Sequence, residues 1–181
     1  IRRDGLDAIG SATKRWKARM DIPYLARKTR FVPYLDLPYY AFQYFSNRVY
    51  RLFSREKRLA FWGPKLDKMQ EILARHSLDE ICALQWKRCV DKSAEALAQM
   101  SADRWIEVSY EEFVHAPQEG LQRILDFLGV EAPEDAKRTA VSKVSPQSIG
   151  KGRQALGPER EERLLPIIQD TLHTSRQAPN V

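Results

Sequence analysis

Three short segments of the chain carry side chains that suit the phosphate of a nucleotide. In the first segment, Arg3 precedes Ser11 by eight residues. An arginine can grip a phosphate through two parallel hydrogen bonds, and a serine hydroxyl on the following helix adds a further donor. In the second segment, Tyr110 ends a short run of β-branched and aromatic residues. In open α/β sheets, ligands gather at the carboxyl ends of strands, so Tyr110 is a candidate ligand contact.

The third segment joins glycines to basic residues. Gly150 and Gly152 allow backbone N–H groups to approach an anion closely, and Lys151 and Arg153 supply positive charge. Each segment also has a plainer interpretation. The first fits a solvated helix start, the second a core tyrosine, and the third a mobile surface loop. Only the three together point to a nucleotide site.

The elements that would position these residues are mostly helical. Apolar residues recurring at steps of three and four predict helices, and Ser77 with Glu80 predicts a capping box. Residues 105–110 read as a strand and residues 145–157 as a loop. One strand among helices fits the C-terminal half of an open α/β sheet. The helices are expected at residues 7–20, 39–59, 65–74, 77–100, 117–129, 133–144 and 158–172, the last of them bent at Pro166.

Bulk properties set limits on the kind of protein. The chain has 181 residues and a net charge of +6, which favours anionic ligands or surfaces. Its longest apolar runs fall short of the roughly 20 residues that span a bilayer, so we expect a cytoplasmic location, with peripheral membrane association as an option. The histidines lack metal-ligand spacing, and we expect no metal. Cys82 and Cys89 lie seven residues apart on one predicted helix and read as buried apolar residues.

Taken in order, the segments resemble the sulfotransferases that use 3′-phosphoadenosine 5′-phosphosulfate (PAPS). That family has an arginine after a strand and a serine eight residues later, matched here by Arg3 and Ser11, with Asp7 between them. The most specific similarity is Val108–Phe113 followed by Pro117 and Phe127-Leu128-Gly129. The family closes its nucleotide site with a glycine-rich basic loop, which residues 149–153 resemble.

The resemblance implies a fold and an activity. The fold would be α/β, the C-terminal and mostly helical part of a P-loop-like parallel-sheet sulfotransferase fold. Residues 1–174 would form the partial domain, with 21–76 as a helical insertion and 175–181 as a loose tail. The donor PAPS, or its product 3′-phosphoadenosine 5′-phosphate (PAP), would contact the residues Arg3, Ser11, Tyr110, Gly150, Lys151, Gly152 and Arg153.

The resemblance also implies which parts lie elsewhere. The chain opens at Ile1, close to the arginine motif, so the phosphate loop and the catalytic base are expected upstream. The chain alone is then expected to be inactive, and its partner would be the missing N-terminal segment or another copy. The acceptor would be a hydroxyl or amine of a glycan, lipid or small molecule. Whether Lys151 or Arg153 contacts the 3′-phosphate stays open.

An aromatic and basic stretch lies between Tyr24 and Trp62. It contains twelve aromatic and eight basic residues and only two acidic residues. A helical hairpin with inward rings is the interpretation that we favour. An acceptor pocket or lid and a surface for membrane or nucleic acid are the alternatives. A rival function for the whole chain is a non-catalytic basic helical module that binds RNA or anionic lipid. The order of the three phosphate segments favours the sulfotransferase, with no nucleic-acid partner.

Overall fold

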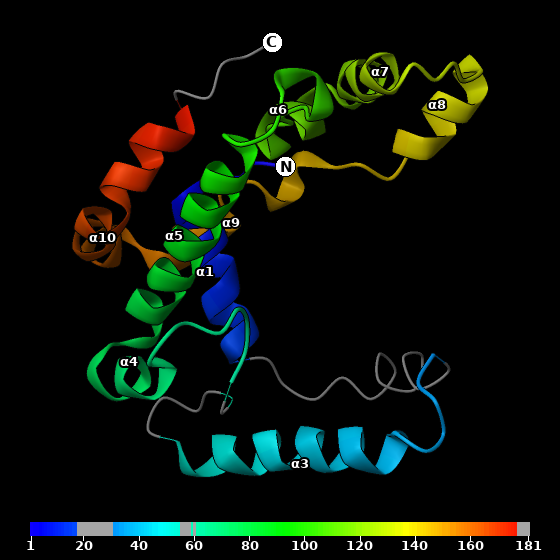
Figure 1. Cartoon of the computed structure of the whole chain (residues 1–181). Helices are drawn as coiled ribbons and strands as arrows, with labels where there is room; N and C mark the ends of the chain where they lie inside the picture. The colour runs from blue at the N-terminus through cyan, green and yellow to red at the C-terminus, as the bar shows by residue number, and fades with distance from the viewer. Residues whose placement is uncertain (18–30, 55–58, 60, 177–181) are drawn as a thin grey trace. The chain divides into compact units, whose positions relative to one another are not determined.

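The computed structural model describes residues 1–17, 31–54, 59 and 61–176, and these residues are predominantly helical (Figure 1). The chain divides into two compact units. One comprises Ile1–Ser11 and Leu66–Val181, and the other Ala12–Lys65. The α-helices are α1 (Gly5–Trp16), α3 (Leu37–Phe53), α4 (Met69–Arg75), α5 (Leu78–Leu97), α6 (Tyr110–His115), α7 (Pro117–Leu128), α8 (Glu134–Val141), α9 (Lys151–Leu156) and α10 (Pro158–Arg176), with 3₁₀ turns η1 (Ala102–Arg104) and η2 (Pro146–Ser148).

The expected α/β parallel-sheet fold is wrong for this chain as the structure describes it. Within the described residues there is no strand or sheet, and the β pairing consists of one isolated parallel bridge between Arg2 and Ser109. In this bridge the Arg2 N–H donates to Val108 O and the Tyr110 N–H donates to Arg2 O, both at 2.8 Å. Residues 105–109 are therefore a connector with a single bridge, and a β-rich composition alone does not make a strand.

Ser109 explains why the predicted strand stops short of Tyr110. Its backbone is extended, and its hydroxyl accepts a hydrogen bond from the Glu112 N–H at 3.4 Å. This is the position of an N-cap, so Tyr110 is the first residue of helix α6 and not the last residue of a strand. Two other predicted helix boundaries are confirmed. Ser77 and Glu80 form a reciprocal capping box at α5, and Gly129 ends α7 with φ 64°.

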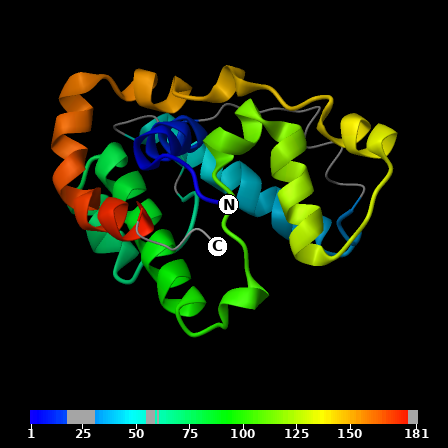
Figure 2. The same cartoon turned by 90° about the horizontal axis from the view of Figure 1, so that it is seen from above.

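Helices α5 and α10 pack together to form the core of the larger unit (Figure 1). Ile81 and Cys82 of α5 and Leu164 and Ile168 of α10 are almost fully buried. Leu6 and Ile9 of α1 and Leu156 of α9 are buried as well. α10 contains Pro166, and this helix changes direction along its length (Figure 2), as expected for a proline within a helix. Cys82 is buried as expected, whereas Cys89 is exposed, which corrects the prediction for that residue.

A polar triad tightens the contact between α5 and α10. The buried Thr171 hydroxyl accepts a hydrogen bond from Lys87 Nζ and donates one to Asp91 Oδ1, each at 2.8 Å. Lys87 and Asp91 also form an ion pair at 3.1 Å, one turn apart on α5. All the polar groups of the triad therefore have partners, which removes the cost of burying Thr171.

The segment predicted as a loop over residues 145–157 is mostly structured. Pro146–Ser148 forms η2, and Lys151–Leu156 forms α9. Gly150 precedes α9 with φ 73°, and Gly157 follows it with φ 75°. Both glycines occupy the left-handed region that L-residues rarely adopt. Both glycines therefore mark the ends of α9. The same glycines had led to the prediction of an open loop, which is wrong for residues 151–156.

The smaller unit has a modest core and an exposed helix. Trp16 is fully buried, its carbonyl accepts from the Leu59 N–H at 2.9 Å, and Phe61 packs edge-on against its ring. The rings of α3 contradict the inward-packed hairpin, since most of those described are exposed. Part of the predicted 21–76 insertion, and residues 177–181 of the predicted tail, lie outside the described residues. Among the helices in the described ranges, none has the length and apolar character that crossing a bilayer requires.

Candidate functional site

The three segments singled out in the sequence meet around the carboxylate of Asp7. Asp7 lies in the first turns of α1 and is 2% exposed. Its Oδ2 accepts from Arg3 Nε at 3.1 Å and Arg3 Nη2 at 2.5 Å. Its Oδ1 accepts from the backbone N–H of Gly152 at 2.5 Å and of Arg153 at 3.2 Å. One carboxylate thus joins the first segment to the third.

These hydrogen bonds hold the Asp7 carboxylate in its charged form. Burial alone would raise the pKa of Asp7, because removing a carboxylate from water disfavours its charge. The side-chain hydrogen bond from Arg3, the backbone hydrogen bonds from Gly152 and Arg153, and the positive charge of Arg3 together outweigh burial. The pKa of Asp7 therefore lies below its ordinary value.

Two glycines allow α1 and α9 to approach each other closely. A Cβ atom on Gly10 would lie 2.0 Å from Gly152 O, and a Cβ atom on Gly152 would lie 2.0 Å from Asp7 O. Real Cβ atoms do not come this close to backbone atoms, so any side chain at either position must push the helices apart. The close approach brings the amide groups at the start of α9 within reach of Asp7.

Tyr110 connects the second segment to the other two. Its hydroxyl lies 2.6 Å from Ser148 Oγ, which belongs to η2 immediately before the glycine segment. The Arg3 guanidinium carbon lies 5.0 Å from the centre of the Tyr110 ring, within the range of a cation–π interaction. The backbone hydrogen bond from the Tyr110 N–H to Arg2 O completes the connection. Arg3 is therefore held by Asp7 along one edge and lies over an aromatic ring.

The remaining predicted ligands belong to the same segments of the chain. Ser11 is half-buried on α1, one turn beyond Asp7. Lys151 is exposed at the first position of α9. Arg153 forms an exposed ion pair with Glu161, with Nε and Nη2 each 3.0 Å from the Glu161 carboxylate. The Gly152 and Arg153 amides contact Asp7, so the anion that they bind is a carboxylate of the chain itself.

Neighbouring acids organise the edge of the site. Arg2 forms an ion pair with Glu107 at 3.2 Å, which separates its role from that of Arg3. The Glu111 carboxylate accepts from the Asp4 N–H at 2.9 Å, and Asp4 Oδ1 accepts from the Asp7 N–H at 2.8 Å. Both acids therefore stabilise the first turn of α1, where free N–H groups need acceptors.

Sequence reasoning noted Asp7 only as a residue between two others. The structure makes it the central acceptor of the site. The signal was present, since Arg3 and Asp7 stand four residues apart, the spacing of a helical ion pair. Glu161 was also missed, because nothing in the sequence relates it to Arg153 before α9 and α10 are formed.

The contact between Tyr110 and Ser148 leads to a first prediction. Tyr110→Phe removes the hydroxyl and leaves the ring beneath Arg3. We expect the free energy of unfolding to fall by about 1 kcal/mol, the net value of a typical hydrogen bond. Ser148→Ala should cost a similar amount, and the double variant should cost clearly less than the sum of the two. Urea denaturation of the three variants measures this coupling.

Tyr34→Phe provides the control, because Tyr34 is 88% exposed. Its effect should stay within about 0.5 kcal/mol, as for most surface substitutions. If the Tyr110 and Ser148 effects simply add, their hydroxyls do not interact in solution.

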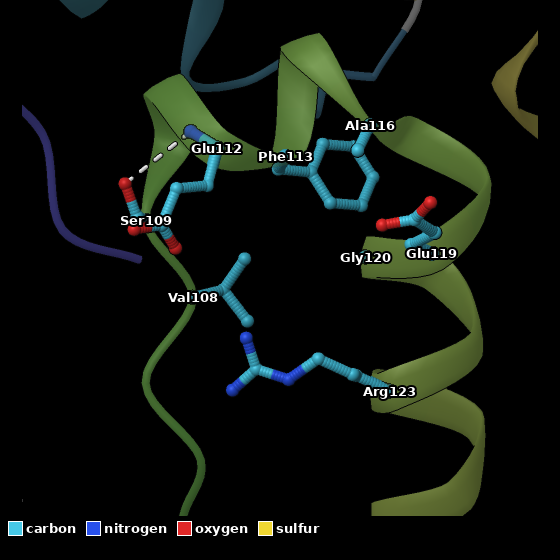
Figure 3. Close-up of a pocket in the computed structure, with 8 residues that line it drawn as sticks. All are labelled: Val108, Ser109, Glu112, Phe113, Ala116, Glu119, Gly120 and Arg123. Carbon is cyan, nitrogen blue, oxygen red and sulfur yellow. Dashed lines mark hydrogen bonds between the residues drawn. The ribbon is translucent and has the colours of Figure 1, made fainter. Parts of the chain in front are cut away.

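A small pocket lies beside α6 and α7 (Figure 3). None of its lining residues belongs to the Asp7 cluster, which consists of Arg3, Asp7, Tyr110, Ser148 and Gly152. Its volume is about 170 Å³, below the roughly 300–1,000 Å³ of typical ligand pockets. Arg123 extends from α7 toward Val108, and the Glu119 side chain lies near the Phe113 ring (Figure 3). This pocket is too small for a nucleotide. Elsewhere in the described ranges, no group of three or more acidic, histidine or cysteine side chains is arranged to hold a metal ion.

Comparison with known proteins supports the resemblance stated above. A model of the sulfotransferase family matches residues 47–134, somewhat under half of the chain. The matched range contains the whole stretch from Val108 to Gly129, the most specific similarity in the sequence. It does not contain Arg3, Ser11 or the glycine segment. No curated protein and no solved structure matches the chain. The match confirms the family resemblance and indicates sulfuryl transfer as the general chemistry.

Proposed function

From this match to the sulfotransferase family, we propose that the chain takes part in transfer of a sulfuryl group from PAPS to an acceptor hydroxyl or amine. In this proposal the Asp7 cluster holds the 3′-phosphoadenosine end of the donor. Arg3 and Ser11 contact the 3′-phosphate, and Tyr110 contributes a ring surface. The acceptor in this proposal is a glycan, a lipid or a small molecule.

One observation carries the proposal: three segments far apart in the sequence converge on one cluster. Arg3, Tyr110 and Gly152 are separated by about a hundred and by about forty residues, yet hydrogen bonds and a ring contact link all three to one another or to Asp7. Each segment by itself has a plain structural interpretation. Their convergence is what a nucleotide site assembled from several segments requires.

The geometry of Arg3 suits a phosphate ligand. A guanidinium has five N–H donors, and the bonds to Asp7 use Nε and Nη2. Asp7 thereby fixes the plane of the guanidinium, and the Arg3 side chain is 32% exposed. We expect its Nη1 group to face the 3′-phosphate. A preorganised arginine loses less side-chain entropy on binding than a mobile one, and this raises the affinity for the ligand.

The cluster supports binding of the donor's nucleotide end, and the proposal assigns it no part in bond breaking. Sulfuryl transfer breaks the bond between sulfur and the phosphate oxygen, forms a bond from sulfur to the acceptor oxygen or nitrogen, and removes a proton from the acceptor. Charge develops on the leaving phosphate oxygen and needs positively charged or N–H donors.

PAP binding tests the role of Arg3. We expect Arg3→Ala to weaken PAP binding by about 1.5–3 kcal/mol, the range for a hydrogen bond to a charged group. Arg3→Lys should lose less, because it keeps the charge but not the planar fork. Arg2→Ala is the matched control, since Arg2 is engaged with Glu107 and should contribute little. Isothermal titration calorimetry gives all four affinities.

A second nucleotide separates loss of recognition from loss of stability. Adenosine 5′-phosphate lacks the 3′-phosphate, so the wild-type protein should prefer PAP over it. This preference should shrink in Arg3→Ala and persist in Arg2→Ala. Equal losses for the two arginines, or an unchanged preference in Arg3→Ala, would show that Arg3 does not contact the 3′-phosphate.

A further inference from the structure

Helix α3 presents an exposed apolar face. The face consists of Phe42, Phe45, Val49, Leu52 and Phe53. These residues are between 52% and 85% exposed. At 3.6 residues per turn they lie on one side of the helix, at steps of three and four. Isolated apolar residues on a surface are ordinary, but a continuous stripe of this kind marks an interaction site.

The charge of α3 selects among the partners that could cover this face. The helix contains Arg48 and Arg51 and no acidic residue. The chain as a whole carries a net charge of +6. A partner with an apolar interior and a negatively charged surface matches both features of the helix. An anionic lipid bilayer has both, and basic amphipathic helices that carry aromatic rings bind such surfaces.

A second copy of the chain is a poorer match for the same face. Residues 42, 45, 49 and 52 do follow a heptad spacing, but they span only two heptads, fewer than a stable coiled coil needs. Pairing two copies would also bring together helices that contain arginines and no acids. Like charges would then oppose the association, whereas an anionic membrane attracts each copy.

We propose that α3 lies parallel to an anionic membrane surface with its apolar face inserted at the headgroup boundary. Its 17 residues extend for about 25 Å along the surface. Phe42, Phe45 and Phe53 enter the boundary between headgroups and acyl chains, where burial of each ring favours binding. Tyr39 and Tyr50 lie along one margin of the stripe, which places them at the headgroup level of the membrane. Tyrosine is enriched at this level in membrane proteins. This mode is peripheral and requires no spanning segment.

Sedimentation with lipid vesicles tests the proposal on the full chain. We expect it to bind vesicles of phosphatidylcholine mixed with phosphatidylserine more tightly than vesicles of phosphatidylcholine alone. Added salt should reduce the difference, because it screens the attraction. The double variant Phe42→Ser/Leu52→Ser should lower the partition coefficient for the mixed vesicles by at least about tenfold, since two large apolar side chains no longer insert.

Leu128→Ser is the matched control, because Leu128 is 60% exposed and lies on α7 of the other unit. It should leave vesicle binding unchanged. Circular dichroism and melting should be the same for all variants, since the substituted side chains are exposed. An unchanged partition in the double variant would overturn the proposal. Absence of vesicle binding would also overturn the proposal and would point to a protein or RNA partner. Loss of dimerisation in the double variant would overturn it as well, because it would show that a second copy covers this face.

Discussion

Replacing Asp7 by Asn should lower the free energy of unfolding by about 3 kcal/mol. Removing one partner of a buried charged pair costs about 3–5 kcal/mol, and the lower end applies because the Arg3 side chain is one-third exposed. The substitution removes the charge that Arg3 requires. Asn also has a single acceptor oxygen, whereas Asp7 uses one oxygen for Arg3 and the other for the N–H groups of Gly152 and Arg153, so one of these two sides would face the NH₂ group. Urea or guanidinium denaturation followed by circular dichroism measures the change.

Asp67→Asn is the control for this prediction. Asp67 is also paired with an arginine, Arg88, at 3.6 Å, but its side chain is 96% exposed. Exposed ion pairs contribute between nothing and about 1 kcal/mol. The two aspartates therefore differ in burial and not in type of partner. A similar small loss for both would mean that the Asp7 hydrogen bonds do not stabilise the fold.

The Asp7 contribution should also depend on pH in a defined direction. Its pKa in the folded chain lies below the ordinary value of 3.8, so the unfolded chain takes up the proton first as the pH falls. The stabilisation is complete above about the ordinary pKa and is lost as the pH falls through the lower, folded pKa. The difference between wild type and Asp7→Asn should therefore be constant at neutral pH and narrow in acid. A difference that grows in acid would contradict the hydrogen bonding of Asp7.

Gly152→Ala should be more damaging, with a loss of more than about 3 kcal/mol in the free energy of unfolding. Overpacking costs about 1–3 kcal/mol where side chains can move aside. Here the new Cβ would meet the Asp7 carbonyl oxygen at 2.0 Å, and backbone atoms of a helix cannot move without disturbing the helix. Thermal and chemical denaturation should both show the loss, and the near-ultraviolet circular dichroism should change as α1 and α9 separate.

Gly150→Ala separates this clash from ordinary glycine effects. Gly150 has φ 73°, and a Cβ at this position would meet nothing within 4 Å. Its substitution should cost about 1–2 kcal/mol, the cost of a left-handed conformation for an L-residue. A Gly152→Ala variant that is no less stable than Gly150→Ala would show that α1 and α9 do not approach as closely as described.

Local signals in the sequence predicted most of the helices, although α6 and α9 were not among the predicted ones. The capping pair Ser77 and Glu80, the proline at the start of α7 and the glycine at its end all act through atoms within one turn. Such signals need no knowledge of the rest of the chain. The observed helix ends differ from the predicted ones by a few residues, because helix ends fray and because packing determines where the last turn stops.

The sheet was predicted wrongly because strand formation depends on a partner. The composition of residues 105–110 favours extended backbone, but the described part of the chain supplies only the bridge to Arg2. The Ser109 hydroxyl then initiates α6, a capping signal that was visible in the sequence beside the misleading one. The family resemblance had also implied a sheet, and the match over residues 47–134 confirms the resemblance without supplying strands.

The candidate site shows the same division between local and distant information. The residue types of all three segments were identified from the sequence, and the structure brings the segments together. The bonds between them were beyond sequence reasoning, since the contact of Asp7 with Gly152 depends on two close-packed glycines. The interpretation that we favoured for the α3 rings, an inward-packed hairpin, was wrong for a related reason. An amphipathic pattern predicts a face, and it does not say what covers that face.

The hydrogen bond between Asp7 and Gly152 spans 145 residues of sequence, and this separation affects the order of assembly. Closing so long a loop carries a large entropic cost, which other contacts must offset first. During synthesis, α1 emerges long before α9. Asp7 therefore cannot bind the Gly152 N–H until most of the chain has left the ribosome. We therefore expect the site to assemble late in folding, after α5 and α10 have formed the core of the larger unit.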